Sequence, residues 1–175
     1  MPADSVSITQ LTPLLHLERS SQVFPQRIAT VYGDRRRTYA EVADEAQQLA
    51  GALAASGVGP GDRVAYLLPN LPEMLVAHFG VPLAHAVLVA VNTRLAGPEV
   101  EYIVQHSGAK ILIADTQLLA GVGIDPASCP DLKEVVTVDD LGVAAPFPTT
   151  SYAELLGRGD GTQRPWRVDD EERVI

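Results

Sequence analysis

Apolar residues along this chain follow two periods in turn, which predicts strands and helices in succession. The runs at residues 64–68 and 111–114 are continuously apolar and indicate strands that are buried on both faces. Between such runs, residues such as Val42, Ala46 and Leu49 recur at helical spacing. The alternation favours an α/β fold, a doubly wound and mostly parallel sheet with flanking helices and right-handed crossovers.

A short helix and a β-hairpin are expected to precede this sheet. Leucines around residues 11–17 have helical spacing, and Gly33-Asp34 separates strands at 28–32 and 36–39. The following pattern predicts, in order, a helix from 39 to about 56, a strand at 63–68, a helix from 70 to about 84, a strand at 87–91, a helix at 97–107, a strand at 111–114, a short helix after Asp115 or Thr116, a strand at 134–138 and a short helix at 151–157.

Several helix boundaries carry recognisable signals. Thr38 with Glu41, and Ser151 with Glu154, have the spacing of capping boxes. Asn70 is expected to cap the next helix, with Glu73 in its first turn. Pro82 should kink or end that helix. The polar, glycine-rich stretch at 157–165 is expected to be flexible, and an acidic run at 169–172 should lead into a strand starting at Arg173.

Composition restricts the classes of function. The chain of 175 residues is expected to form one domain, residues 1–175, and its net charge of −9 argues against nucleic acid as a partner. Cys129 is the only cysteine, so no internal disulfide can form. The longest strongly apolar tract, at 86–91, is too short to cross a membrane. The N-terminus lacks a signal-peptide pattern, and we expect a cytoplasmic location.

Phosphate-binding signatures are missing from the sequence. The glycines at 57–61 close a helix and lead into a strand, the reverse of the order in which a helix N-terminus holds a pyrophosphate. No Walker-type G-x-x-x-x-G-K-[ST] motif occurs, and the only lysines, Lys110 and Lys133, lie beside predicted strands. His78 and His85 are too far apart on one helix to share a metal ion, and no metal site is predicted.

Two groups of residues remain as candidates for ligand contact. The run Arg35-Arg36-Arg37 lies at the hairpin. It is either a solvated turn or a site that binds a phosphate or an acidic surface of a partner. Asn92 and Arg94 follow a buried strand, and ligands of open α/β sheets lie beyond the carboxyl ends of strands. Arg94 could offer a bidentate fork to a phosphate or could tie its loop to a neighbouring carboxylate.

The order and spacing of several short motifs closely resemble the N-terminal part of adenylate-forming acyl-CoA synthetases, the fatty-acid–CoA ligase family. The likeness covers residues 10–175. It rests on Thr38-Tyr39-Ala40-Glu41, Gly61-Asp62-Arg63-Val64-Ala65, Leu68-Pro69-Asn70-Leu71-Pro72-Glu73, Phe79-Gly80-Val81, Val91-Asn92-Thr93-Arg94-Leu95, Tyr102-Ile103 and Ser107-Gly108-Ala109-Lys110.

This resemblance implies an enzyme that activates a fatty or other carboxylic acid with ATP and Mg²⁺ and transfers the acyl group to CoA. It places the ATP-binding segments and the catalytic residues beyond Ile175, so no catalytic residue is assigned here and no cofactor is expected to bind this chain alone. It also implies that Arg94 approaches the phosphate-bearing end of CoA. At position 85 this chain has His where such relatives commonly carry glycine, which leaves the local packing open to question.

Two alternatives remain open at this point. The chain could be a stand-alone, non-catalytic α/β binding or interaction module. It could also belong to a related adenylating enzyme that does not use CoA as acceptor, such as one that serves a peptidyl-carrier domain or an oxygenase. If the sheet was built for a larger domain, we expect exposed apolar surface and self-association into a homo-oligomer.

Overall fold

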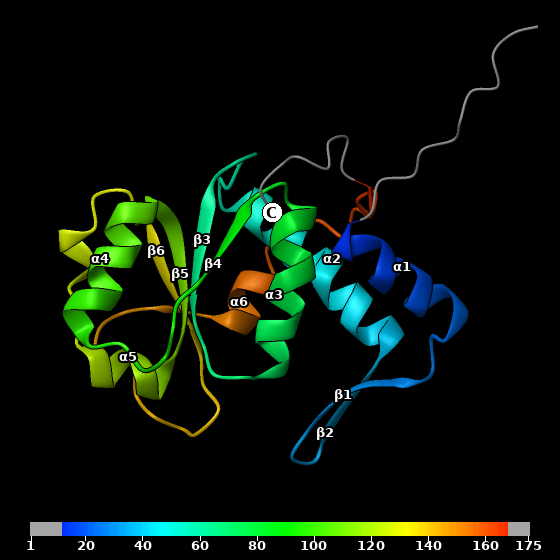
Figure 1. The fold of residues 1–175 in the computed structure, drawn as a ribbon, viewed down its shortest axis with the longest axis horizontal. Helices are drawn as coiled ribbons and strands as arrows, with labels where there is room; N and C mark the ends of the chain where they lie inside the picture. Colours follow the sequence, from blue (N-terminus) through cyan, green and yellow to red (C-terminus); the bar gives the residue numbers. More distant parts are fainter. Residues whose placement is uncertain (1–11, 168–175) are drawn as a thin grey trace, which may run out of the picture.

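The computed structural model describes residues 12–167 and shows a parallel sheet between layers of helices (Figure 1). Five strands pair in the order β4-β3-β5-β6-β7, and all neighbours run parallel. A separate antiparallel hairpin consists of β1 and β2. The elements are α1 (Pro13–Val23), β1 (Ile28–Tyr32), β2 (Arg35–Thr38), α2 (Tyr39–Ala55), β3 (Arg63–Leu67), α3 (Pro72–Leu83), β4 (Val87–Ala90), α4 (Gly97–Ser107), β5 (Ala109–Asp115), α5 (Thr116–Val122), a 3₁₀ turn η1 (Pro126–Ser128), β6 (Glu134–Val138), β7 (Thr150–Ser151) and α6 (Tyr152–Leu156).

The predicted doubly wound α/β architecture is confirmed. Helices α4 and α5 cover one face of the sheet, while α2, α3 and α6 cover the other, with α1 outside them (Figure 1). Because successive strand residues point to opposite faces, Val64 and Tyr66 of β3 pack toward α2, whereas Ala65 and Leu67 pack toward α4. The continuously apolar run therefore reflects a strand with two buried faces, as its sequence predicts.

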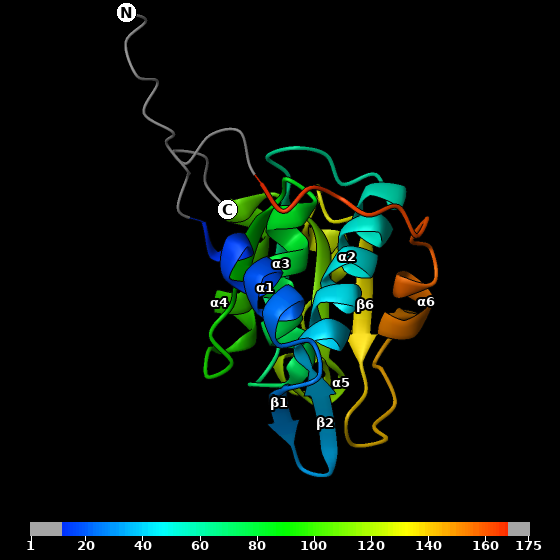
Figure 2. The same ribbon diagram turned by 90° about the vertical axis from the view of Figure 1, so that its right-hand side faces the viewer.

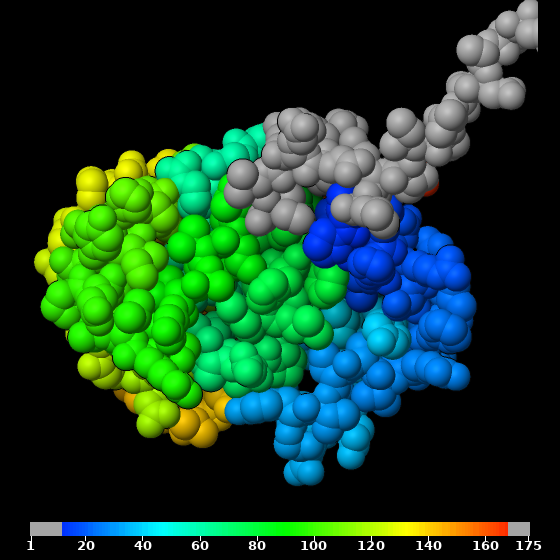
Figure 3. Space-filling view, viewed as in Figure 1, coloured from blue at the N-terminus to red at the C-terminus, as the bar shows by residue number. Residues whose placement is uncertain are grey.

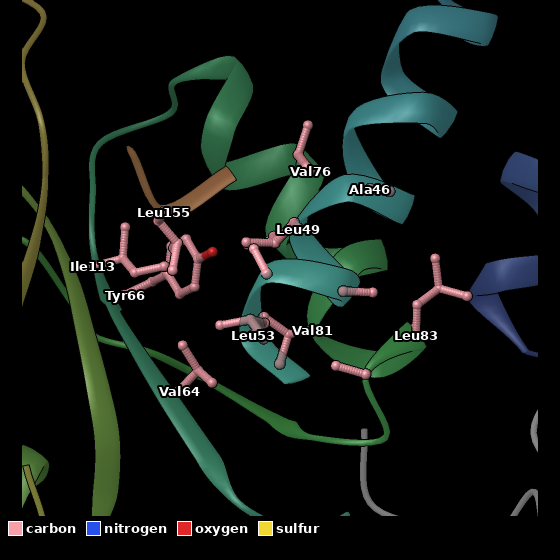
Figure 4. Packing of buried hydrophobic residues seen from close by; sticks show 14 of the residues in the cluster. Ala46, Leu49, Leu53, Val64, Tyr66, Val76, Val81, Leu83, Ile113 and Leu155 are labelled. Carbon is pink, nitrogen blue, oxygen red and sulfur yellow. The ribbon is translucent and has the colours of Figure 1, made fainter. Parts of the chain in front are cut away.

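The larger core layer depends on close approach of α2 and α3. A Cβ atom added to Gly80 of α3 would lie 2.7 Å from Cδ2 of Leu49 on α2, so only glycine allows this helix spacing. Figure 4 shows Leu49 and Leu53 of α2 beside Val81 of α3, above the sheet residues Val64 and Tyr66. These side chains are almost completely buried.

Most helix starts follow the expected capping signals. Thr38 and Ser151 each form a full capping box, and the Asp115 side chain accepts a hydrogen bond from Leu118 N at 2.9 Å. The prediction for Asn70 is wrong. The helix starts at Pro72, so Leu71 occupies the N-cap of α3, and its apolar side chain cannot accept a capping hydrogen bond. Glu73 lies inward and pairs with arginines of β2.

The end of α3 explains the unusual residue at position 85. Pro82 lies in the last turn of the helix, which ends at Leu83. His85 then has φ +57°, and within residues 12–167 it is the single non-glycine residue in the left-handed region. Glycine adopts this conformation without steric cost. The imidazole is exposed, so His85 leaves the helix-to-strand packing intact at a cost in backbone strain.

The hairpin lies at the end of the molecule to which the sheet strands point. Figure 2 shows the arrowhead of β6 directed toward β1 and β2, and the space-filling view in Figure 3 shows the hairpin projecting beside α3. Strand β2 starts at Arg35 and ends at Thr38, since Tyr39 already begins α2. The arginine run is thus part of a strand rather than the turn.

The polar segment after α6 is anchored, contrary to the expected flexibility. Gln47 of α2 is 4% exposed and forms two hydrogen bonds with the backbone of Arg164. Arg158 pairs with Glu134 of β6 at 2.7 Å.

The predicted acidic run at 169–172 and the strand from Arg173 lie outside the described residues. Within the part of the chain that the structure covers, no helix has the length and hydropathy needed to span a bilayer.

Candidate functional site at the carboxyl edge of the sheet

A hollow of about 440 Å³ lies where β3 and β4 end. Its walls come from the two segments that leave these strands, residues 68–70 and 90–93, together with Met74 of α3. The backbone amide of Val91 donates a hydrogen bond to the carbonyl of Tyr66 at 2.8 Å. This bond keeps the segments that follow β3 and β4 next to each other. The position agrees with the expectation that ligands of open α/β sheets bind beyond the carboxyl ends of the strands.

The exit loop of β4 fixes the backbone of Arg94. Asn92 Oδ1 accepts a hydrogen bond from Arg94 N at 3.0 Å, a local turn that asparagine side chains commonly make. Arg94 is exposed and directly follows Thr93, the last residue that lines the hollow. No described carboxylate lies within ion-pair distance of its guanidinium. Of the two roles considered for Arg94, tying the loop to a neighbouring carboxylate finds no support among residues 12–167.

A second hollow of about 400 Å³ adjoins the first and reaches the hairpin. Both are lined by Asn70 and Met74, and the second adds Val31 and Tyr32 of β1 with Leu75 and His78 of α3. The carboxyl edge of the sheet therefore presents a joined depression. Its floor is mainly apolar, and its polar groups are amides, hydroxyls and imidazole.

Two arginines of the run, Arg35 and Arg37, form ion pairs, whereas Arg36 is exposed and has no ion pair among residues 12–167. Arg37 bonds to both Glu45 and Glu73, with Nη2 at 3.2 Å from Glu73 Oε1, and Arg35 also pairs with Glu73. Arg35 Nη1 lies 3.7 Å from Asp140 Oδ1 in the loop after β6. Arg35 and Arg37 therefore do not form a solvated turn, because they hold the hairpin to α2, α3 and the β6 loop. Contact of the run with phosphate or an acidic partner stays a prediction.

Glu45 and Glu73 are residues whose role the sequence interpretation missed. Glu73 is 5% exposed, and Glu45 lies on the apolar side of α2, three residues after Val42 and four before Leu49. A carboxylate on an inward helix position needs a cation nearby, because burial of an unpaired charge is costly. Inward glutamates close in sequence to three arginines were the signal that could have revealed these ion pairs.

The groups that would ordinarily hold a nucleotide phosphate are engaged elsewhere. Lys110 Nζ lies 2.5 Å from Asp62 Oδ2, and the amide of Gly59 donates to the same oxygen at 2.7 Å. Gly61 N donates to His85 O at 2.8 Å. The stretch 57–61 is thus a structural turn, as predicted. No three His, Cys, Asp or Glu side chains of the described region are grouped as metal ligands.

Another hollow, of about 750 Å³, lies away from this edge. It is bounded by the segment after α5, by β6 and by residues 147–150. The carboxylate of Glu134 on its border is already bonded to Arg158 and Thr150. We therefore take the carboxyl edge beside Arg94 as the candidate site.

Comparison with known proteins decides the family. A family model described as AMP-binding enzyme matches residues 17–170, most of the chain. The chain belongs to the AMP-binding enzyme family. The resemblance expected from the sequence motifs is therefore confirmed.

Two curated plant relatives show which members of the AMP-binding family this chain is similar to. An acetate/butyrate–CoA ligase of Arabidopsis thaliana, AAE7, is 40% identical over 117 residues, which are 67% of this chain and 21% of that protein. A benzoate–CoA ligase of the same plant is 33% identical over 176 residues, covering 94% of this chain and 30% of the relative. Both are named as peroxisomal.

Solved structures agree on the fold. The anthranilate CoA ligase AuaEII, in complex with anthranoyl-AMP, superposes with a TM-score of 0.77 at 28% sequence identity. The match covers 86% of this chain and 28% of that protein. This AMP-binding chain thus spans about a fifth to a third of the length of the relatives that it matches.

Proposed function

We propose that this chain is the N-terminal part of a carboxylic acid–CoA ligase. Such an enzyme joins the carboxylate to ATP, which gives acyl-AMP and releases pyrophosphate. The thiol of CoA then attacks the acyl carbon, forming the thioester and releasing AMP. Membership of the AMP-binding family and the printed names of both curated relatives, which are CoA ligases, support this proposal and favour CoA over other acceptors.

In this proposal the chain supplies the scaffold and one edge of the ligand site. Arg94 is exposed one residue beyond Thr93, which lines the hollow at the end of β4, and the Asn92 turn fixes the backbone of Arg94. A guanidinium can donate two parallel hydrogen bonds to one phosphate group. We assign Arg94 to a phosphate of CoA, and this exposed arginine beside the hollow is the observation that carries the assignment.

The described residues do not fit ATP and Mg²⁺. Lys110 is paired with Asp62, the Gly59 and Gly61 amides are bonded within the chain, and no carboxylates are grouped for a metal ion within residues 12–167. Activation of the acid with ATP and Mg²⁺ therefore belongs to the remainder of the longer enzyme. We propose that this chain alone has no ligase activity and binds no cofactor.

The acid and the cellular location belong to the proposal as well. A fatty acid is the substrate class that the sequence motifs favour, whereas the two curated relatives are named for acetate or butyrate and for benzoate. The cytoplasm is the location that we propose. The peroxisomal names of both relatives make the peroxisome the competing location.

The assignment of Arg94 is tested in a polypeptide that carries this chain together with the rest of a CoA ligase. Arg94→Ala should raise KM for CoA roughly 10- to 100-fold, since a charge-assisted hydrogen bond contributes about 1.5–3 kcal/mol. ATP–pyrophosphate exchange should stay unchanged, because it precedes CoA. Arg36→Ala, a change of another exposed arginine, is the control. An unchanged KM for CoA in the Arg94 variant would contradict the assignment.

A further inference from the structure

Six buried side-chain polar atoms lack a hydrogen-bond partner among the described residues. Two are the hydroxyls of Thr12 and of Thr30 on β1, and the other four come from β3, α2, α3 and α6. These four are the hydroxyls of Tyr66 and Tyr152 and one carboxylate oxygen each of Glu45 and Glu73, Oε1 and Oε2 respectively. Each atom exposes less than 1 Å² of surface. Buried polar groups in folded proteins almost always have a partner, either protein or water, so this concentration requires an explanation.

The ion pairs of Arg37 bring these groups together from separate elements. Arg37 bonds to Glu45 Oε2 of α2 and Glu73 Oε1 of α3, which leaves one oxygen of each carboxylate without a partner. Tyr66 projects from β3 toward α2 (Figure 4). Tyr152 opens α6, and its pKa is raised by burial and then by the nearby Tyr66, Glu45 and Glu73. Tyr66 and Tyr152 both pack in the core layer beneath α2, the helix that carries Glu45, so the two hydroxyls and the two carboxylates border one region.

The chemistry of this region selects a small, neutral occupant. The guanidinium groups of Arg35 and Arg37 balance the carboxylates of Glu45 and Glu73, so no net charge remains to attract an ion. A side chain from outside cannot reach atoms that expose less than 1 Å². Two tyrosine hydroxyls can donate and two carboxylate oxygens can accept, and water offers two acceptor and two donor positions.

We propose that an internal water molecule occupies this region and links Tyr66 and Tyr152 to the carboxylates of Glu45 and Glu73. The water accepts hydrogen bonds from the tyrosines and donates to the glutamates. Buried waters of this kind typically make about three hydrogen bonds and act as part of the structure. Here the water connects α6 and β3 to the ion pairs that hold the hairpin at the carboxyl edge of the sheet.

A high-resolution crystal structure of the chain tests the proposal directly. A water molecule should lie within about 3.2 Å of a tyrosine hydroxyl and a glutamate oxygen of this set. A dry region overturns the proposal, whether the hydroxyls bond directly to the carboxylates or remain without partners. Density from a bound ion in place of water also overturns it.

Conservative variants provide a second test in solution. If water bonds both hydroxyls, Tyr66→Phe and Tyr152→Phe should each lower Tm by about 2–4 °C, because each loses roughly one hydrogen bond. Their double variant should lose less than the sum, since both share one water. Tyr102→Phe, at a residue 62% exposed, is the matched control and should leave Tm unchanged. A Tm that rises or stays constant in Tyr66→Phe overturns the proposal, because removing an unbonded buried hydroxyl relieves its desolvation.

Discussion

Gln47 binds the backbone of Arg164, 117 positions later in the chain, through both ends of its carboxamide. The Arg164 amide donates to Gln47 Oε1 at 2.8 Å, and Gln47 Nε2 donates to the Arg164 carbonyl at 2.9 Å. Gln47 is buried on α2, so both bonds are shielded from water. This pair of bonds fixes the segment after α6 along α2.

Replacing Gln47 by Ala should release this segment. Loss of two shielded hydrogen bonds is expected to destabilise the segment by about 1–3 kcal/mol, which should raise amide exchange at residues 158–166 roughly tenfold or more. Hydrogen–deuterium exchange measured by mass spectrometry checks this. Gln48→Ala, the exposed neighbour on the same helix, is the control. Equal exchange in the two variants would show that the carboxamide does not hold the segment.

The left-handed conformation of His85 predicts an unusual order of stabilities. His85→Gly should raise the free energy of unfolding by about 0.5–1 kcal/mol, because glycine adopts φ +57° freely. His85→Val should lower it by about 1–2 kcal/mol, since a β-branched residue is strained there. Urea denaturation measures both. His78→Gly, within α3, is the control and should be destabilising by about 1 kcal/mol. A valine variant as stable as the glycine variant would refute this explanation.

The ion pair between Glu134 and Arg158 predicts a dependence of stability on pH. The hydrogen bond from Arg158 is the main cause that holds the pKa of Glu134 below its ordinary value of 4.5, against the opposing effect of burial. A depressed pKa in the folded state stabilises the fold above pH 4.5, and this contribution disappears as the pH falls through the folded-state pKa. Because Arg158 is 37% exposed, the effect should be below about 1 kcal/mol.

Thermal unfolding between neutral and acidic pH tests this dependence. The chain should be more stable than its Glu134→Gln variant at neutral pH, and the difference should shrink as the pH falls below about 4.5. Asp44→Asn, at an exposed carboxylate of α2 without an ion pair among the described residues, is the control. A difference that stays constant down to acidic pH would rule out the ion pair as its cause.

Exposed apolar side chains predict self-association of the isolated chain. On the hairpin, the side chains of Val31 and Ile28 are 57% and 48% exposed. Phe24 at the end of α1 is 46% exposed, and Leu75 of α3 is 38% exposed. Exposed apolar surface of this kind commonly marks a site of protein contact. Sedimentation velocity should show dimers or larger species that decrease in a Val31→Ser, Ile28→Ser double variant. A monomer at all concentrations would contradict the expectation.

The local signals in the sequence predict most of the fold because they agree with tertiary packing. The apolar run in β3 indicates two buried faces, and the boxes at Thr38 and Ser151 form as expected. Such features depend on neighbouring residues, which a single sequence displays directly. Asn92 and Arg94 are likewise found at a strand exit beside a hollow, where the order of elements places them.

The remaining features depend on contacts between distant segments. Glu73 has the spacing of a capping residue, but two arginines of β2 pair with it instead. Gln47 gives no local sign that it will bind Arg164. Buried polar contacts of this kind arise only when helices and strands assemble, so periodicity and capping signals do not reveal them.

The most direct test of the proposed role is ATP–pyrophosphate exchange by the purified chain. Folding is first verified by circular dichroism, and the chain is then incubated with ATP, Mg²⁺, labelled pyrophosphate and acetate, benzoate or a fatty acid. If activation of the acid belongs to the rest of a longer enzyme, as we propose, the exchange should not exceed that of a blank without protein. Exchange above the blank with any of these acids would contradict the claim that this chain is a scaffold with one ligand-binding edge.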